Sequence, residues 1–259
     1  MNGRRGLIAF VAAVTLVSVV RLSQSVVAAD PGQAFKPVAP AQEVAQVLGE
    51  YTAALEKLAQ KKPARRRGWS KIAHRAWIIG EMANLLTLQN DSSGQLAKQA
   101  ASAIDAAKAL GKTAKLRKFE PMAGYVKTIR DANRAIAKAT AQGLPKPGSK
   151  NGFATVAPLI EIMELNQSQF DVLLDHADKK PTDDAAYRDI AHAAWLLAET
   201  GNLMTLRDTD KKDWQGWAGE MRGLGTKLAA AAAMKDFPAI KKLIAGLDTN
   251  CLACHDEYQ

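Results

Sequence analysis

Apolar residues recur along the chain at the spacing of one face of an α-helix. In residues 41–61 they follow an i, i+3, i+4, i+7 pattern: Val44, Val47, Leu48, Tyr51, Leu55 and Leu58. This stripe predicts an amphipathic helix. Similar periodicity, together with stretches rich in alanine and lysine that favour helix, predicts seven more helices: 69–88, 94–116, 119–139, a stretch that includes 162–174, 187–206, 212–234 and 237–257.

The helical pattern is written twice, with a constant offset of 118 residues. Ile72-Ala73-His74 recurs as Ile190-Ala191-His192, and Glu81 recurs as Glu199. The same offset relates Ala39-Pro40, Lys61-Lys62, Pro63, Trp77, Asn84-Leu85 and Phe119 to Ala157-Pro158, Lys179-Lys180, Pro181, Trp195, Asn202-Leu203 and Phe237. A register this constant indicates a duplication.

Short connections between the predicted helices should make neighbouring helices antiparallel. We therefore expect an all-α protein of two tandem up-down-up-down four-helix bundles, at residues 30–140 and 157–259. Residues 141–156 are dense in Pro and Gly and are expected to form a flexible linker.

The first 29 residues have the layout of a secretory signal peptide. Arg4 and Arg5 precede an apolar run, and Val27-Ala28-Ala29 places small residues before a cleavage point. The apolar run is shorter than the roughly 20 residues of a membrane span, so we expect a periplasmic or otherwise exported chain without a span after cleavage. An uncleaved anchor is the alternative, which Arg21 slightly favours.

The net charge of the chain indicates which kinds of binding partner to expect. The formal charge of +9 falls to +6 if the three arginines of the signal peptide are removed. A moderately basic surface suits an acidic redox partner or an anionic membrane face. No basic run is interleaved with aromatic residues as a nucleic-acid groove requires, so we expect no nucleic-acid partner.

One loop differs in charge between the two copies. Arg65-Arg66-Arg67 precedes the second helix of the first copy, where the second copy has Asp183-Asp184-Ala185. A solvated loop, a contact between the copies and a basic docking patch for an acidic partner are the three interpretations.

Both cysteines of the chain lie in the run Cys251-Leu252-Ala253-Cys254-His255. A C-x-x-C-H run is a covalent haem attachment motif: thiols at i and i+3 on one helical face can add to the two haem vinyl groups, and the next imidazole can bind the iron. A disulfide across two residues would restrict little chain entropy. We therefore expect one haem c, attached through Cys251 and Cys254, with His255 as the proximal iron ligand.

A four-helix bundle with this motif near the end of its last helix resembles the cytochrome c′ family and its six-coordinate relatives. The resemblance covers about residues 157–259 and rests on Phe237, Ile240, Leu243, Cys251, Cys254, His255 and Tyr258. The basic residue that family members usually carry soon after the haem histidine is missing from residues 256–259. Relatives often pair through their first two helices, which implies an intrachain pseudo-dimer with one haem and a monomeric protein.

The first copy serves as a control for the haem pocket. It has Asn133, Ile136 and Ala137 where the second has Cys251, Cys254 and His255, so it cannot hold haem c. Four further residues differ between the copies and are expected at the same end of the bundle: Met163, Met204, Trp214 and Trp217, in place of Ala45, Leu86, Leu96 and Gln99.

A methionine thioether is a familiar sixth ligand of haem iron. In the six-coordinate relatives that methionine comes from the first helix, so the resemblance favours Met163, with Met204 second and core packing as the alternative for both. Trp214 and Trp217 are expected to pack against the porphyrin. His192 lies roughly 18 Å along the helix from Met204, and its counterpart His74 persists in the copy without the motif. Both histidines are therefore expected to be structural, tying their helix to the loop before it.

No acid–base pair or nucleophile–base set surrounds the motif in the sequence. An electron carrier is therefore predicted rather than an enzyme. Two alternatives are a five-coordinate gas-binding or gas-sensing haem protein, and a haem-bearing subunit that the first bundle recruits to a larger complex.

Overall fold

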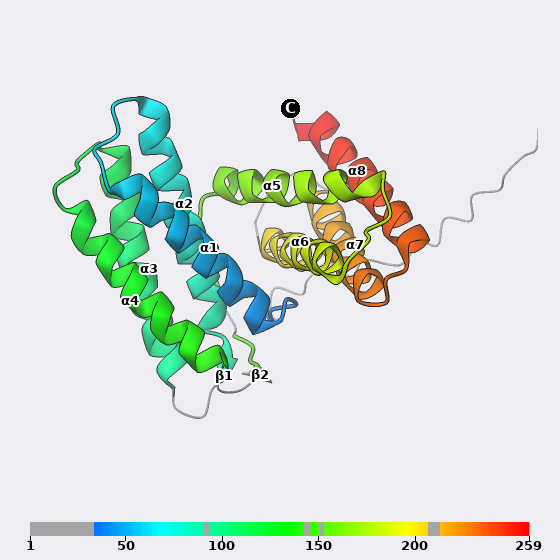
Figure 1. Ribbon diagram of the computed structural model, residues 1–259, viewed down its shortest axis with the longest axis horizontal. Helices are drawn as coiled ribbons and strands as arrows, with labels where there is room; N and C mark the ends of the chain where they lie inside the picture. Colours follow the sequence, from blue (N-terminus) through cyan, green and yellow to red (C-terminus); the bar gives the residue numbers. More distant parts are fainter. Residues whose placement is uncertain (1–33, 91–93, 142–145, 151–152, 207–212, 259) are drawn as a thin grey trace, which may run out of the picture.

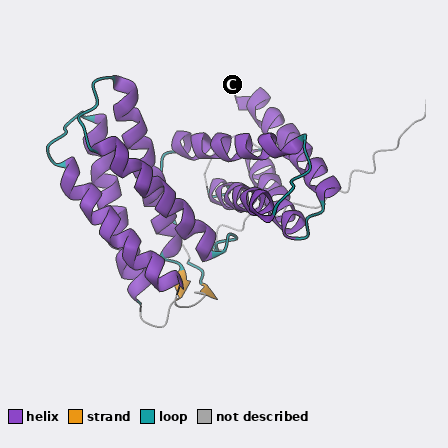
Figure 2. Ribbon diagram, in the orientation of Figure 1, coloured by secondary structure: helices purple, strands orange, loops and turns teal. Residues whose placement is uncertain are grey.

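The structure, a computed structural model, describes residues 34–90, 94–141, 146–150, 153–206 and 213–258. In these ranges the chain is almost entirely helical, which confirms the all-α class (Figure 1, Figure 2). The predicted signal peptide, residues 1–29, lies outside the described residues. The helices are α1 (Ala41–Ala59), α2 (Arg66–Leu86), α3 (Gln95–Lys115), α4 (Met122–Ala141), α5 (Leu159–Ala177), α6 (Asp184–Met204), α7 (Trp214–Ala233) and α8 (Phe237–Tyr258).

Helices α1–α4 form one group, which we call the N-terminal unit. α1 packs against α2 and α4, and α3 packs against the same two helices, so each helix has two neighbours. The predicted apolar stripe of α1 faces inward, and Val44, Leu48 and Leu55 are fully buried. Burial of such a stripe supplies most of the stability of helices that would be marginal alone.

Helices α5–α8 form the second group, the C-terminal unit. α6 packs against α5 and α7, and α7 packs against α8, but α5 makes far less contact with α8 than α1 makes with α4. The α6–α7 pair is tight because Gly201 and Gly225 lie at the contact. A Cβ on Gly201 would lie 2.7 Å from the backbone nitrogen of Arg222. This unit is therefore closed on the α6–α7 side and loosely joined along α5 and α8.

The Pro- and Gly-rich connection between the units forms backbone hydrogen bonds with the N-terminal unit in its described part. Its strand β2 (Lys146–Pro147) pairs antiparallel with β1 (Gln89–Asn90), and Gly148 N donates to Leu88 O at 2.7 Å. Phe35 and Lys150 exchange two backbone hydrogen bonds. These two-residue strands, which helical periodicity did not predict, anchor the connection to the N-terminal unit.

Each unit binds the extended segment that precedes the first helix of the other unit. We call these two segments the arms. Glu81 of α2 accepts hydrogen bonds from the backbone N–H groups of Val156 and Ala157, which precede α5, at 2.5 and 2.6 Å. Glu199 of α6 accepts the equivalent bonds from Val38 and Ala39, which precede α1, both at 2.7 Å. Each buried carboxylate thus accepts hydrogen bonds from the backbone of the other unit's arm. The two contacts are related by the 118-residue offset.

The same reciprocity holds for other contacts between the units. Asn84 Nδ2 donates to Ala154 O, and Asn202 Nδ2 donates to Lys36 O, each at 3.0 Å. The rings of Phe35 and Phe153, which are equivalent residues, stack on each other with centroids 4.5 Å apart. The units therefore meet about an approximate twofold axis that passes near these two rings.

Within the described ranges, no helix combines the length and the apolar character that a membrane crossing requires.

Candidate functional site

The C-x-x-C-H run occupies the end of α8. Cys254 is buried, with 6% of its surface exposed, while Cys251 and His255 are half-buried. Residues three apart lie on one face of a helix, so the two thiols share the face of α8 that turns toward the core of the C-terminal unit. Helix α8 thus carries both thiols on its inward face.

The environment of Cys251 lowers the reactivity of its thiol. Burial, with smaller effects from Cys254 and Asp248, raises the pKa of the Cys251 thiol to about 11. The thiolate is the nucleophilic form of cysteine, so at neutral pH this side chain is a protonated, weakly reactive thiol.

The structure brings the other predicted pocket residues to the same core. Cys254, Met204 and Trp214 belong to one cluster of buried residues, and Met163 and Trp217 pack against it. Met163 comes from α5, Met204 is the last residue of α6, and the two tryptophans lie in the first turn of α7. Their placement at helix ends follows the bundle geometry from which they were selected.

A buried amide holds three methionine sulfurs at the centre of this region. Asn166 Nδ2 lies 3.6 Å from Met204 Sδ, 3.9 Å from Met163 Sδ and 4.0 Å from Met221 Sδ. We call these three methionines and Asn166 the thioether cluster. It contains both predicted distal candidates, and it adds Asn166 and Met221, which the sequence analysis missed.

The equivalent positions of the N-terminal unit are apolar. Asn166 and Met204 replace Leu48 and Leu86, both fully buried, while Met163 and Met221 replace alanines 45 and 103. Asn166 is itself only 7% exposed, and its Oδ1 accepts no hydrogen bond from the residues that the structure describes. An unsatisfied buried acceptor costs about 1–3 kcal/mol. The C-terminal unit therefore carries a costly polar group where its counterpart has a leucine.

A second asparagine lies next to the motif. Asn250, 5% exposed, donates from Nδ2 to Trp217 O at 3.1 Å and replaces the buried Ala132 of the N-terminal unit. Its Oδ1 likewise has no donor among the described residues. Trp214 Nε1 donates to Met204 O at 2.9 Å, which ties the start of α7 to the end of α6.

This donor set fits a haem. The thiols and the imidazole lie at the end of α8, and thioether sulfurs gather from α5, α6 and α7. The buried amide oxygens of Asn166 and Asn250 lack donors among the described residues. Soft thioethers and imidazole are ligands that iron accepts. The loose α5–α8 contact is the side on which this unit differs most from the N-terminal unit.

His74 and His192 lie at the junction of the units instead. His74 Nδ1 contacts Glu161 Oε2 at 2.8 Å, and His192 Nδ1 makes the equivalent contact with Glu43. Both histidines are hydrogen-bonded, but the expected partner was wrong: each binds the first helix of the other unit rather than the loop before its own helix. The contact is reciprocal because Glu43 and Glu161 are themselves equivalent residues.

One of these two contacts has a set of ligand atoms that could bind a cation. His74, Glu161 and Glu164 place one possible ligand atom each within 4.8 Å of one another. The other junction has Gln46 in place of Glu164 and forms its histidine–glutamate contact without a second carboxylate. The shared function of the two contacts is therefore to clasp the units together.

A comparison of the chain with protein-family models, with curated proteins and with solved structures finds no match.

Proposed function

We propose that this chain is an exported monohaem c-type cytochrome that acts in electron transfer. The observation that carries the proposal is the convergence of the C-x-x-C-H end of α8 with the thioether cluster in one core. The duplicated unit has Asn133, Ile136 and Ala137 in place of the motif, and only leucine and alanine in place of the cluster. A merely structural helix end would need neither the cysteines nor the buried amide.

Different residues would attach the haem, bind its iron and pack beside it. Cys251 and Cys254 would hold the haem covalently, and His255 would bind the iron on the proximal side. The haem itself would supply a one-electron ferric–ferrous couple. Met163, which lies on the half-buried edge of the thioether cluster, is the preferred distal ligand, with Met204 second. Trp214 and Trp217 would pack beside the ring and exclude water, which lowers the local dielectric around the iron.

We further propose that each unit is an up-down-up-down four-helix bundle similar to the cytochrome c′ family, at residues 30–140 and 157–259. The reciprocal arm and histidine contacts support an intrachain pseudo-dimer of the two bundles, one of them without haem. Sedimentation of the purified protein should then give a monomer. A stable dimer built through the C-terminal unit alone would contradict this arrangement.

The proposal includes export to the periplasm and a redox partner with an acidic surface. The signal-like N-terminus and the net positive charge support both. Transfer to such a partner should slow as salt is raised, because the attraction between the two surfaces is screened.

Expression of the full chain in a host that matures c-type cytochromes tests the function. We expect a covalent haem that survives acid–acetone extraction, and a low-spin ferrous spectrum that carbon monoxide does not change. Met163→Ala should give a high-spin spectrum. Met234→Ala is the matched control, since Met234 is 72% exposed at the end of α7 and should leave the spectrum unchanged.

The outcomes separate the alternatives. A chain without covalent haem would refute the cytochrome assignment. A five-coordinate, carbon-monoxide-binding haem would instead support the gas-binding alternative. Conversion to high spin by Met204→Ala and not by Met163→Ala would move the distal ligand from α5 to α6.

A further inference from the structure

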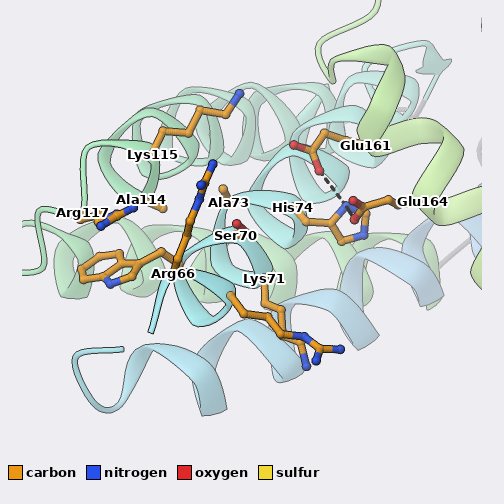
Figure 3. A pocket seen from close by; sticks show the side chains of 12 residues that line it. Arg66, Ser70, Lys71, Ala73, His74, Ala114, Lys115, Arg117, Glu161 and Glu164 are labelled. Carbon is orange, nitrogen blue, oxygen red and sulfur yellow. Dashed lines mark hydrogen bonds and ion pairs between the residues drawn. The ribbon is translucent and has the colours of Figure 1, made fainter. Parts of the chain in front are cut away.

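A basic pocket lies at the junction of the two units, away from the C-x-x-C-H motif (Figure 3). It is a hollow of 660 Å³ between the first two turns of α2, the end of α3 and the start of α5. Its cations come from two helices and one turn that are distant in sequence: Arg66, Arg67, Lys71, Lys115 and Arg117. We call this hollow the junction pocket.

Comparison with the C-terminal unit shows that the arginine end of the pocket lacks an acidic partner. In the C-terminal unit, Lys235 Nζ binds Asp184 Oδ1 at 2.7 Å, and this ion pair holds the pKa of Asp184 below its usual range. The equivalent residues of the N-terminal unit are Arg117 and Arg66. An ion pair in one unit is thus replaced by two cations in the other.

The backbone at this point is the same in both units. Arg117 and Lys235 have φ values of 54° and 55°, the left-handed region that non-glycine residues rarely adopt. In each unit this residue ends the third helix with the same bonds: Lys118 N donates to Thr113 O, and Asp236 N donates to Ala231 O. The geometry that delivers a cation to the start of the second helix is therefore retained, while its acidic partner is not.

The N-terminus of α2, which lies at the pocket, also lacks the acidic cap that α6 has. Asp183 caps α6 by accepting a bond from Ala186 N at 2.8 Å, whereas Arg65 at the same position of α2 makes no side-chain cap bond. The first turn of α2 contains no acidic residue. A helix N-terminus carries a partial positive charge and favours anions, so the arginines here add like charge to an already positive end.

The acidic residues that line the pocket lie at its other end. Glu161 and Glu164 contact His74 Nδ1 at 2.8 and 3.2 Å. Figure 3 shows this trio on one side and Arg66, Lys115 and Arg117 on the other. Within the described part of the chain, Arg66 and Arg117 form no ion pair with a carboxylate, so their charge is available to an anionic ligand.

We propose that the junction pocket binds a small anion with at least two carboxylate or phosphate groups, held between Arg66, Arg117 and the start of α2. Guanidinium groups bind both kinds of oxyanion in bidentate fashion, and the hollow has the size of ordinary small-ligand sites. This site is independent of the haem proposal, since none of its lining residues belongs to the haem motif or the thioether cluster.

Calorimetric titration of the full chain with citrate and with pyrophosphate, at constant ionic strength set with sodium chloride, tests the proposal. We expect at least one of the two to bind at one site per chain and to raise the melting temperature. Arg66→Asp recreates the ion pair of the C-terminal unit and should weaken binding at least about 10-fold. Arg134→Asp makes the same charge change on an exposed position of α4, outside the pocket, and should leave the affinity within about twofold of wild type.

A second variant guards against misfolding of the first. Arg67→Ala copies Ala185 of the C-terminal unit and should weaken binding about threefold or more. Binding of citrate alone would identify a carboxylate ligand, and binding of pyrophosphate alone would identify a phosphate ligand. The proposal fails if neither anion binds, if Arg66→Asp and Arg134→Asp bind alike, or if only an oligoglutamate peptide binds, which would make the hollow a docking surface for an acidic protein.

Discussion

The two units present the same helices with different interiors, and the difference separates what builds the fold from what serves the site. The residues that both copies share, Glu81 with Glu199 and His74 with His192, lie at the junction and hold the units together. Met163, Met204 and Trp214, which only the C-terminal unit carries, belong to or pack against the same buried cluster as Cys254 near the end of α8. A duplication thus supplies an internal reference: the polar residues that both copies share at the junction are part of the architecture, and buried polar residues found in one copy are candidates for a site.

Placing an asparagine at the position of the N-terminal unit that is equivalent to Asn166 should give the largest change in stability. Leu48→Asn would remove a fully buried apolar side chain from α1 and leave an amide without partners. We expect a loss of about 4 kcal/mol in the free energy of unfolding, measured by urea denaturation. Leu116→Asn, at a position that is 67% exposed, should change it by less than about 0.5 kcal/mol.

The reverse change, Asn166→Leu, should stabilise the haem-free chain by about 1 kcal/mol, because it removes the unsatisfied Oδ1. A destabilising result would show that Asn166 is a structural part of the C-terminal core and would end its assignment to the site.

Removing either junction carboxylate should have the next largest effect. Glu81→Ala and Glu199→Ala each leave two backbone N–H groups of an arm unpaired, and each should cost about 3 kcal/mol. The two losses should agree within about 0.5 kcal/mol if the contacts are equivalent. Glu120→Ala, at an exposed position, is the control; a clear inequality between the two variants would break the symmetry of the junction.

The motif should also differ from an unfolded thiol in reactivity. Because the pKa of Cys251 is about 11, its alkylation by iodoacetamide at pH 8 in the haem-free chain should be about 100-fold slower than in the same chain unfolded in urea. Mass spectrometry of the labelled peptide measures both rates. Equal rates would show that the end of α8 is open to solvent in the folded chain.

A further effect concerns the pH dependence of stability. Burial raises the pKa of Glu199 to about 6, although the N–H groups of Ala39 and Val38 and the Asn202 amide act in the opposite direction. Since the folded state then holds this proton more tightly than the unfolded state, stability should fall as pH rises from about 4.5 to 6, by at most about 2 kcal/mol. Glu199→Gln should flatten this part of the stability curve, and an unchanged slope would assign it to other groups.

Helical periodicity predicted the elements well because each helix buries one continuous stripe. The first helix was expected at 41–61 and spans Ala41–Ala59. The start of α2 was placed three residues late, since its first turn, Arg66-Arg67-Gly68, is exposed or half-buried and offers no apolar signal. The paired strands β1 and β2 were missed because two residues are too few to show a period.

The residues that share the core with Cys254 were predicted only in part. Met163, Met204, Trp214 and Trp217 were found because they differ between the copies and lie near the motif. The same comparison could have found Asn166 and Met221, where Leu48 and Ala103 stand in the first copy, had it been extended to every buried position. The junction contacts could not be predicted, because residues shared by both copies give no sign of which unit they touch.

The exchange of arms has a consequence for the order of folding. When α4 has been made, Glu81 still lacks its N–H donors, because Val156 and Ala157 follow it by 75 and 76 residues. The arm at Val38 and Ala39 waits longer, since Glu199 lies 161 and 160 residues further along the chain. Neither half can therefore complete its own hydrogen bonding during synthesis or after cleavage at the connection. The chain should unfold in a single cooperative transition, and separately expressed halves should gain their full helical stability only when mixed.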